Sequence, residues 1–402
     1  MQRESGINSY RVVLICHFNN ELISKKLKVS NGQEFAPWIY EFIKLFSDQK
    51  KIELHVISPH SKIYKCKTIR FSNSVTLHFF PNYRLGKVFS KFSQEFNIKS
   101  DYVFHRKTIY RKCSKIKPDI IHLFGAENPY YSASGLKLSE KYPIVLTIQG
   151  IINHVQENSK YISYKKDLEI RLVKKIVHFG VRDNDMINFI KSNNSSPIFH
   201  YHDIPIKEVK KINNRIKRYD LIFFARIVKT KGIEDYLLLI KLLKEKFKHN
   251  IYAAVIGHCE ERYENFLKSI IDQYEIKDCI HWIGCMKNID DIHGIVVQSR
   301  IIVLPTYADT IPGTILEGIQ LKIPVISYKV GGIPTLNSRR NSILLADKGD
   351  VEMLYQHTVT LLENQDFKNK LVDNAYYTFQ EGWGFSALKN SIVSMYDQVI
   401  NK

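Results

Sequence analysis

The chain has 402 residues, of which 44% are hydrophobic and 25% are charged, the composition of an ordinary soluble protein of two or three domains. This composition excludes a disordered or fibrous chain. The formal net charge is +19, from 59 Lys and Arg against 40 Asp and Glu. Residues 1–200 carry 32 basic and 16 acidic side chains, whereas residues 201–402 carry 27 and 24, so the excess positive charge belongs to the first half.

The positive charge is densest at residues 61–120, which hold 14 basic and 3 acidic side chains. One face of the first domain should therefore attract an anionic partner: nucleic acid, an anionic membrane surface or an acidic substrate. The six cysteines form no Cys-x-x-Cys pair, which favours a reducing compartment over a disulfide framework. Because no apolar run approaches the roughly 18 residues needed to span a bilayer, any membrane contact should be peripheral.

Short β-branched runs alternate with longer segments of helical period, a pattern typical of βαβ units in parallel sheets. In the first half a helix is expected at Glu34–Phe46. The strands predicted there are Val12–Cys16, Leu54–Ile57, Ile120–Phe124, Ile144–Ile148 and Lys175–Phe179.

The second half repeats this alternation, with helices expected at Ile233–Phe247 and Arg262–Tyr274. The strands predicted there are Leu221–Phe224, Tyr252–Ile256, Ile280–Ile283, Ile301–Leu304 and Val325–Ser327. The sequence therefore predicts an α/β protein with two doubly wound sheets, joined by a polar linker at His202–Asp220. The expected organisation is a Rossmann-like domain at 1–205, a second one at 206–382, and a helix at 383–402 that returns to the first domain.

The stretch from Leu304 to Val325 says most about function. A strand ends at Leu304, a loop follows, and a helix is expected to begin near Thr314. In open α/β sheets, ligands bind beyond the carboxyl ends of the strands. The free amides at a helix start also form a seat for phosphate, here at Gly313 and Thr314.

Two acids and two cations accompany this helix start. Glu317 is expected in the first turn, where its carboxylate can accept hydrogen bonds from a ribose diol, and Asp309 can reach a second hydroxylated group. Either acid could instead only complement the helix dipole. Arg226 and Lys231 follow the Leu221–Phe224 strand at the same sheet edge, where two cations suit a diphosphate. With the phosphate seat, they favour a nucleotide diphosphate bound without a metal ion.

These residues resemble the nucleotide-sugar half of retaining glycosyltransferases of family 4, of the bacterial polysaccharide and lipopolysaccharide type. Such enzymes have the GT-B fold, in which two Rossmann-like domains face a central cleft and a C-terminal helix crosses between them. The resemblance is carried by the Arg226 to Gly232 loop, the Asp309-x7-Glu317 spacing and the Gly331-Gly-Ile-Pro run.

Further matches complete the resemblance. Gly257 and Gly284 stand where the family places glycines on the nucleotide side, and Gly32 stands where it has a glycine-rich turn near the donor. In the first half, Pro118–His122 and Val145–Gly150 resemble the two strand ends that face the cleft.

The resemblance implies that a sugar moves from a nucleotide diphosphate to a saccharide or lipid-linked acceptor with retained anomeric configuration. Arg226 and Lys231 would neutralise the leaving diphosphate, Glu317 would hold the ribose, and Asp309, where the family usually has Glu, would contact sugar hydroxyls. Gln149 stands where many members have His.

Two residues of the first domain are candidate catalytic groups. Gln149 can hydrogen-bond a sugar hydroxyl but cannot transfer a proton at neutral pH. His122 is the second candidate, with a purely structural histidine as the alternative interpretation.

One motif could support metal-dependent chemistry instead. Asp183-Asn-Asp185 is the only Asp-x-Asp in the chain, and such a pair can hold a divalent cation against phosphates. An N-cap before the helical segment Met186–Lys191 is the favoured interpretation, because Asp is a preferred cap. The sequence therefore predicts neither a metal ion nor another cofactor.

The basic stretch interleaves cations such as Lys87, Lys91, Arg111 and Lys112 with aromatic residues. This mixture suits an anionic membrane surface and predicts a cytoplasmic protein held peripherally at the inner face of a membrane. A nucleic-acid binder has a similar composition, but the sequence has no zinc finger and no RNA-binding signature, so we expect no nucleic-acid partner. A sugar-nucleotide epimerase or a phosphorylase of the same fold remains open as an alternative reaction.

Overall fold

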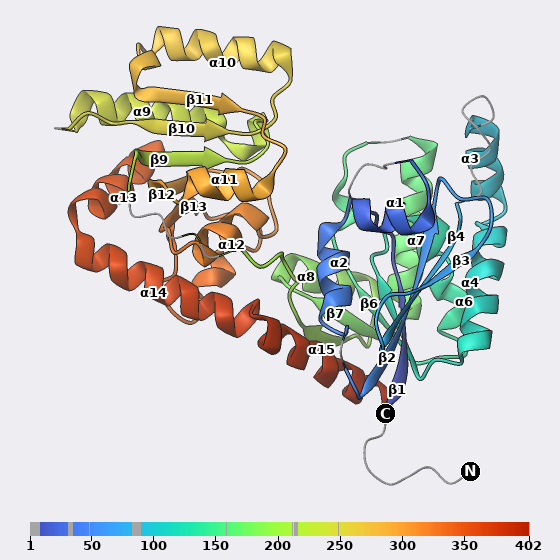
Figure 1. The fold of residues 1–402 in the computed structure, drawn as a ribbon. Helices are drawn as coiled ribbons and strands as arrows, with labels where there is room; N and C mark the ends of the chain where they lie inside the picture. Colours follow the sequence, from blue (N-terminus) through green and yellow to red (C-terminus); the bar gives the residue numbers. More distant parts are fainter. Residues whose placement is uncertain are drawn as a thin grey trace. The chain divides into compact units, whose positions relative to one another are not determined.

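The computed structural model describes residues 9–401 apart from 31–34, 48, 83–89, 158, 211, 213–215 and 248. For residues 90–92 it describes only the backbone. The chain divides into two compact units, each containing one sheet (Figure 1). The first unit comprises Met1–Lys207 and Phe385–Lys402, and the second comprises Glu208–Gly384.

The first unit is built on an eight-stranded, almost wholly parallel sheet. Its strands are β1 (Tyr10–Ile15), β2 (Ile52–His60), β3 (Lys67–Arg70), β4 (Val75–Pro81), β5 (Ile120–Phe124), β6 (Ile144–Thr147), β7 (His178–Val181) and β8 (Ile198–Tyr201). The strand order is β3-β4-β2-β1-β5-β6-β7-β8, and only β3 pairs antiparallel, with β4. The edge pair β3–β4 and the edge strand β8 are additional to the strands expected from the sequence.

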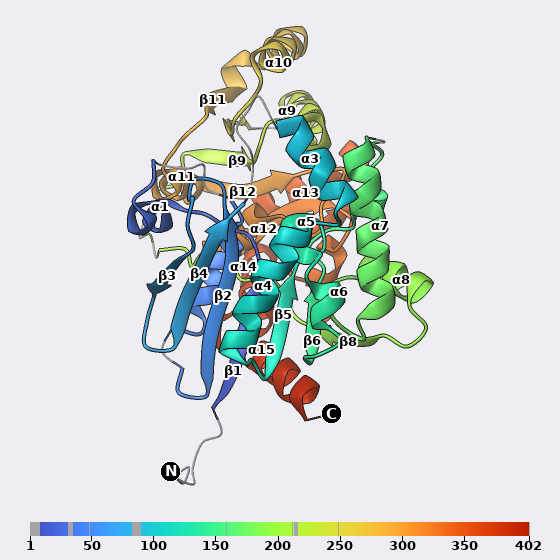
Figure 2. The same ribbon diagram turned by 90° about the vertical axis from the view of Figure 1, so that its right-hand side faces the viewer.

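Helices cover both faces of this sheet. They are α1 (Glu21–Leu27), α2 (Pro37–Lys44), α3 (Ser90–Lys99), α4 (Val103–Ile116), α5 (Pro129–Ser132), α6 (Gly135–Leu138), α7 (Lys160–Lys175), α8 (Asn184–Asn193) and α15 (Phe385–Ile400). Figure 1 shows α2 and α4 on opposite sides of the sheet, and in Figure 2 α4 lies in front of it.

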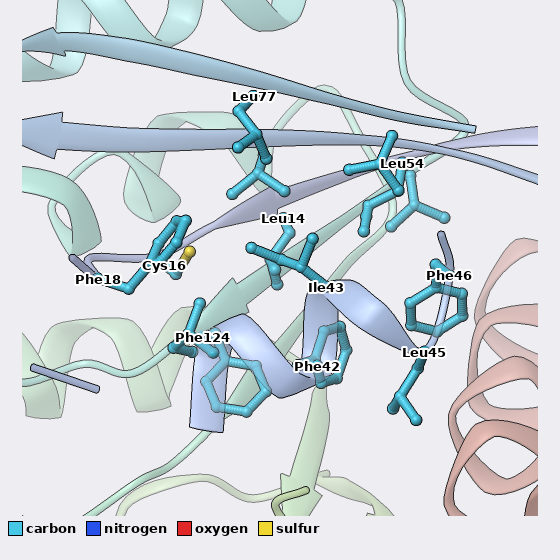
Figure 3. Packing of buried hydrophobic residues seen from close by; sticks show 14 of the residues in the cluster. Leu14, Cys16, Phe18, Phe42, Ile43, Leu45, Phe46, Leu54, Leu77 and Phe124 are labelled. Atoms are coloured by element: carbon cyan, nitrogen blue, oxygen red, sulfur yellow. The ribbon is translucent and has the colours of Figure 1, made fainter. Parts of the chain in front are cut away.

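Two hydrophobic clusters separate the layers of the first unit. Successive side chains of a strand point to opposite faces, so β1 sends Val12 and Leu14 into one cluster and Val13 and Ile15 into the other. The first cluster contains side chains of α1, α2 and α15, and the second contains those of α4 to α8. Figure 3 shows part of the first cluster, with Ile43 of α2 beside Leu14 of β1. Because both faces are covered, the central strands are apolar runs rather than alternating ones.

The second unit contains a six-stranded sheet, parallel throughout, in the order β11-β10-β9-β12-β13-β14. These strands are β9 (Tyr219–Phe224), β10 (Ala253–Ile256), β11 (Ile280–Gly284), β12 (Ser299–Leu304), β13 (Val325–Tyr328) and β14 (Leu344–Ala346). Its helices are α9 (Ile233–Lys246), α10 (Glu261–Gln273), α11 (Ile289–Val296), α12 (Gly313–Gln320), α13 (Val351–Glu363) and α14 (Gln365–Gly382). The prediction of two parallel, doubly wound sheets is confirmed.

One predicted strand is misplaced. The segment Lys175–Phe179 was expected to be a strand, but α7 continues to Lys175 and the strand β7 occupies His178–Val181. Ile176 is buried as the C-cap residue of the helix, so part of the apolar run belongs to the helix end.

Among the described residues, no helix is long and apolar enough to cross a membrane.

Candidate functional site

The predicted donor residues of the second unit gather where its parallel strands end. Phe224 and Ile256 are paired as the last residues of β9 and β10, so the loops that follow them leave the sheet at one edge. The Ala225 amide donates to the Ile256 carbonyl at 3.1 Å, and the Gly257 amide donates to the Gly284 carbonyl at 2.9 Å. This is the sheet edge at which open α/β proteins bind their ligands.

An ion pair joins the two predicted donor loops. Lys231, in the loop after β9, binds Asp309, in the loop after β12, and their side chains are 16% and 20% exposed. The backbone supports the pair, because the Tyr307 amide donates to the Thr230 carbonyl at 2.8 Å. Arg226 is exposed in the first of these loops. The structure thus places one cation and one acid of the predicted set in direct contact.

Asp235, on α9, is hydrogen-bonded to the loop after β12 and to the end of β13. Its Oδ2 accepts hydrogen bonds from the hydroxyls of Tyr307 and Tyr328, each at 2.6 Å. The bond to Asp235 raises the pKa of Tyr307 to about 12. Sequence reasoning missed this acid, whose role is to position the loop that carries Asp309.

Glycines let these loops pack closely. Gly331 has a φ of +52°, and a Cβ there would overlap the carbonyl oxygen of Asp309. Gly257 has a similar constraint, because a Cβ would overlap the Ala225 carbonyl oxygen. Gly284 has a φ of +77° and open space around it, so its backbone conformation alone favours glycine.

The helix α12 begins at Gly313 after the N-cap residue Pro312, whose side chain makes no capping hydrogen bond. Gly313 and Thr314 are its first two residues, and the first amides of a helix have no partner within the helix. These two residues therefore have the placement that a phosphate seat requires.

Glu317 lies one turn further along than the sequence suggested. It is the fifth residue of α12, so it belongs to the second turn rather than the first. Helical side chains point back toward the N-terminus, and Glu317 Oε1 lies 3.7 Å from the position that a Cβ on Gly313 would occupy. The carboxylate still reaches the helix start.

The buried partner of Glu317 is a residue that sequence reasoning missed. His293, on α11, places Nε2 2.9 Å from Glu317 Oε2, and the two side chains are 5% and 23% exposed. A single histidine within an apolar helical segment gives no sequence signal, because such residues are usually structural.

In the first unit, Gln149 has its side-chain amide fixed from both ends. Its Nε2 donates to the Phe124 carbonyl at 3.0 Å and to Glu127 Oε1 at 3.3 Å, while Trp38 Nε1 donates to its Oε1 at 2.7 Å. Burial raises the pKa of Glu127, whose Oε2 is buried without a hydrogen-bond partner among the described residues. Arg182 also donates to the Gln149 carbonyl, at 2.7 Å.

His122 has the surroundings of a structural residue. It is completely buried, with Nδ1 hydrogen-bonded to the Tyr396 hydroxyl at 2.8 Å and Nε2 to Thr147 Oγ1 at 2.7 Å. Burial holds its pKa well below the usual value. Since both ring nitrogens link elements of the first unit, we do not keep His122 in the catalytic set. Gly32, also assigned to the donor site, lies outside the described residues.

The Asp-x-Asp motif caps a helix. Asp183 is the N-cap of α8, and its carboxylate accepts a hydrogen bond from the Met186 amide at 2.8 Å. Asp185 lies 3.3 Å from His154. Across the part of the chain that the structure describes, no group of three or more His, Cys, Asp or Glu side chains is placed to hold a metal ion.

The second unit is similar to a known protein family. Residues 206–378 match the family Glycosyl transferases group 1. The match lies almost wholly within the second unit and covers less than half of the chain. The match contains every residue of the predicted donor site in this unit.

Relatives of known name agree with this family. An uncharacterised glycosyltransferase of Methanocaldococcus jannaschii, MJ1069, is 22% identical over 387 residues, covering 90% of this chain and 94% of its own. The putative teichuronic acid biosynthesis glycosyltransferase TuaC of Bacillus subtilis is 22% identical and covers 68% of each chain. The putative colanic acid biosynthesis glycosyltransferase WcaL of Escherichia coli is 27% identical over 146 residues, 34% of each chain. These relatives support glycosyltransferase activity.

Solved structures show the GT-B fold. Sucrose-phosphate synthase from Thermosynechococcus elongatus superposes with a TM-score of 0.69 at 12% identity, covering 98% of this chain and 99% of its own. A trehalose-6-phosphate protein from Escherichia coli bound with UDP-2-fluoro glucose also gives 0.69, at 11% identity, covering 96% and 99%. The predicted fold class is therefore confirmed.

Proposed function

We propose that this chain is a retaining family 4 glycosyltransferase, which moves a sugar from a nucleotide diphosphate to a saccharide acceptor without a metal ion. The observation that carries the proposal is the pair of loops in the second unit. There Lys231 forms an ion pair with Asp309, which lies a few residues before the start of α12 at Gly313. That helix start has no side-chain capping hydrogen bond. Cation, acid and helix amides are the groups that a sugar diphosphate requires.

The leaving diphosphate is the group that most needs stabilisation. When the bond between the anomeric carbon and the phosphate oxygen breaks, its electron pair stays on the diphosphate. Arg226 and Lys231 supply positive charge there, and the amides of Gly313 and Thr314 supply fixed donors. A diphosphate that binds Lys231 competes with Asp309, which is then available to accept hydrogen bonds from the donor sugar.

Glu317 holds the nucleoside part of the donor. Its carboxylate is partly exposed near the start of α12 and can accept hydrogen bonds from a ribose diol. Support comes from proteins of similar fold: the Escherichia coli protein above was bound with UDP-2-fluoro glucose, and HepE of Anabaena (TM-score 0.62, 12% identity, covering 97% of this chain and all of its own) with UDP and glucose.

Gln149 is the group of the first unit that contacts a sugar. With Trp38 as one donor to its Oε1, a second lone pair of that oxygen remains for a hydroxyl hydrogen. Gln149 therefore orients a hydroxyl and moves no proton.

The acceptor is membrane-associated in this proposal, as suits polysaccharide assembly at an inner membrane face. The supporting feature, here called the α3–α4 surface, carries exposed rings of Phe96 and Phe104, stacked at 6.0 Å between centroids. A cavity of about 300 Å³, lined by side chains of α4 and by Ser134 and Lys137, has four cationic residues in its lining. These are Arg106, Lys107, Arg111 and Lys137. Two other cations expected at this surface, Lys87 and Lys91, have side chains outside the described residues.

The test is a mass-spectrometric screen of purified protein against nucleotide sugars, with and without lipid-linked saccharide acceptors. We expect acceptor-dependent release of one nucleoside diphosphate and a product of retained configuration, in chelator as well as without it. Glu317→Ala should abolish this activity, while Asp183→Asn, which keeps an N-cap, should not.

Three results would reject the proposal. Activity lost both in chelator and in Asp183→Asn would indicate a metal site. Conversion of the donor sugar without an acceptor would indicate an epimerase, and dependence on inorganic phosphate would indicate a phosphorylase.

A further inference from the structure

The hydrogen bond between His293 and Glu317 assigns a role to a residue outside the donor loops. We propose that His293 is a positioning residue, which fixes the Glu317 carboxylate so that it can bind the ribose diol of the donor nucleotide. This inference rests on the proposed function of Glu317 as the ribose-binding acid. His293 itself does not contact the substrate.

The first argument is the difference in exposure. The His293 side chain is 5% exposed and the Glu317 side chain 23%, so Glu317 is the member of the pair that a ligand can reach more easily. A carboxylate only accepts hydrogen bonds, so Nε2 of His293 must carry the proton that it shares with Oε2. That contact leaves Oε1, and one further lone-pair position of Oε2, available to two hydroxyls.

The second argument concerns rigidity. A glutamate side chain loses rotational freedom when it is fixed, and this loss opposes binding. Glu317 is already held at one oxygen by α11, a helix whose start is secured by the Asn288 side chain accepting from the Asp290 amide at 3.0 Å. A group that is fixed before the ligand arrives loses less freedom on binding, which strengthens binding and improves specificity.

The experiment compares nucleosides that do and do not carry the diol. Titration calorimetry with UDP, GDP, ADP and CDP first identifies the tightest ligand, which is then compared with its 2′,3′-dideoxy form. Loss of a hydrogen bond to a charged group predicts that Glu317→Ala weakens binding of the ribose form about 10- to 100-fold and barely changes binding of the dideoxy form.

Variants of His293 decide the inference. We expect His293→Ala to weaken binding of the ribose form about 5- to 10-fold without changing binding of the dideoxy form, and His293→Gln, which keeps a donor, to recover most of the loss. His281→Ala is the matched control, since His281 is a half-buried histidine of the same unit bonded to the Tyr219 hydroxyl at 2.7 Å. It should leave the ratio of the two affinities unchanged.

The ratio of affinities separates positioning from folding, because a partly unfolded sample loses binding of both nucleotides equally. Equal losses for both forms in His293→Ala, or no loss for either, would overturn the inference while leaving Glu317 in place. Tight binding of the ribose form by Glu317→Ala would instead overturn the ribose assignment, and the inference with it.

Discussion

Lys231 and Asp309 illustrate how two charges can serve a ligand rather than the fold. Both side chains are largely buried at the end of the sheet, and each is the charged partner of the other. Ion pairs of this kind contribute little net stability, because desolvation offsets attraction. In the proposed function, the diphosphate of the donor replaces Asp309 as the partner of Lys231, so the pair serves binding more than stability.

The two members of this pair should therefore respond differently to removal. Lys231→Ala is expected to weaken nucleoside diphosphate binding about tenfold and to reduce kcat about 100-fold or more, because a donor to the leaving group is lost. Asp309→Ala should reduce kcat while leaving diphosphate affinity unchanged or stronger, because Lys231 loses its competitor. Calorimetry and steady-state kinetics measure both. Parallel losses of affinity in the two variants would contradict the exchange of partners.

Single histidines show where residue-level prediction ends. His122 lies within β5, a strand of a parallel sheet of the kind that binds ligands at its carboxyl edge. Both of its ring nitrogens are nevertheless hydrogen-bonded to side chains of the first unit. His293 has no such context in the sequence, yet it touches Glu317. Sequence spacing identifies residues on one strand or helix face, whereas contacts between α11 and α12 depend on how the helices pack. The contact between Lys231 and Asp309 fits their expected placement at one sheet edge, because each lies in the loop after a predicted strand.

At the scale of elements, the glycine run after β13 sets how closely two loops approach. Gly331 adopts a left-handed φ and lies against the Asp309 carbonyl, and the Gly332 amide donates to the Thr310 carbonyl at 2.8 Å. A side chain at Gly331 would therefore displace the loop that carries Asp309.

Gly331→Ala should lower the free energy of unfolding by about 2 kcal/mol or more and weaken diphosphate binding, because strain and overlap with backbone add. Gly294→Ala is the opposite case, since Gly294 lies within α11 and has open space around it. There the change should stabilise by about 0.5–1 kcal/mol, as expected for alanine in a helix. Urea unfolding measures both, and a Gly331→Ala protein as stable as the native one would contradict the close contact.

Elements were predictable from sequence where burial on both faces makes an apolar run, as in β5, whose bounds match the prediction. The edge strand β3, Lys67–Arg70, has little apolar character because it has a single neighbour and is mostly exposed. Its pairing with β4 could not be inferred. The same limit explains the Lys175–Phe179 error, since a short apolar run can close a helix as well as open a strand.

At the scale of the whole molecule, the first unit contains buried histidines that must remain neutral. Burial lowers the pKa of His105 and of His202 to about 4 and holds that of His122 well below the usual value. The pKa of Asp203 shifts in the opposite direction, because burial raises it to about 7. In the unfolded chain histidine titrates near pH 6.5, so acidification favours unfolding between pH 6.5 and 4, while protonation of Asp203 opposes it.

In the first unit, the histidines whose pKa is lowered by burial outnumber the acids whose pKa is raised by it, which are Asp203, Glu127 and Glu169. A shift such as that of His105 or His202 is worth about 3 kcal/mol, so we expect the first unit to lose stability on acidification from pH 7 to 4.5. Asp203→Asn removes one opposing contribution and should make that loss steeper. Fluorescence of Trp38 during urea unfolding, in a Trp282→Phe and Trp383→Phe background, reports on this unit alone. Stability that is constant or rises toward pH 4.5 would contradict the assignment.

The uneven charge of the two halves predicts binding to an anionic membrane surface. Of the net charge of +19, the larger part lies in residues 1–200, and the α3–α4 surface combines exposed Arg111 with the aromatic pair Phe96 and Phe104. Cations near an anionic leaflet contribute about 1 kcal/mol each, and this attraction falls with salt. Such a surface should bind anionic vesicles reversibly.

We therefore expect flotation with vesicles containing 30% phosphatidylglycerol at low salt, and little with neutral phosphatidylcholine. Replacing Arg111 and Lys112 by Gln should weaken vesicle binding about 30-fold, because two contributions of about 1 kcal/mol are lost. The matched control replaces two exposed cations of the second unit, Arg262 and Lys277, and should bind as the native protein does. Equal binding to neutral vesicles, equal losses in both variants, or tighter binding to RNA than to vesicles would show that the basic first half serves another partner.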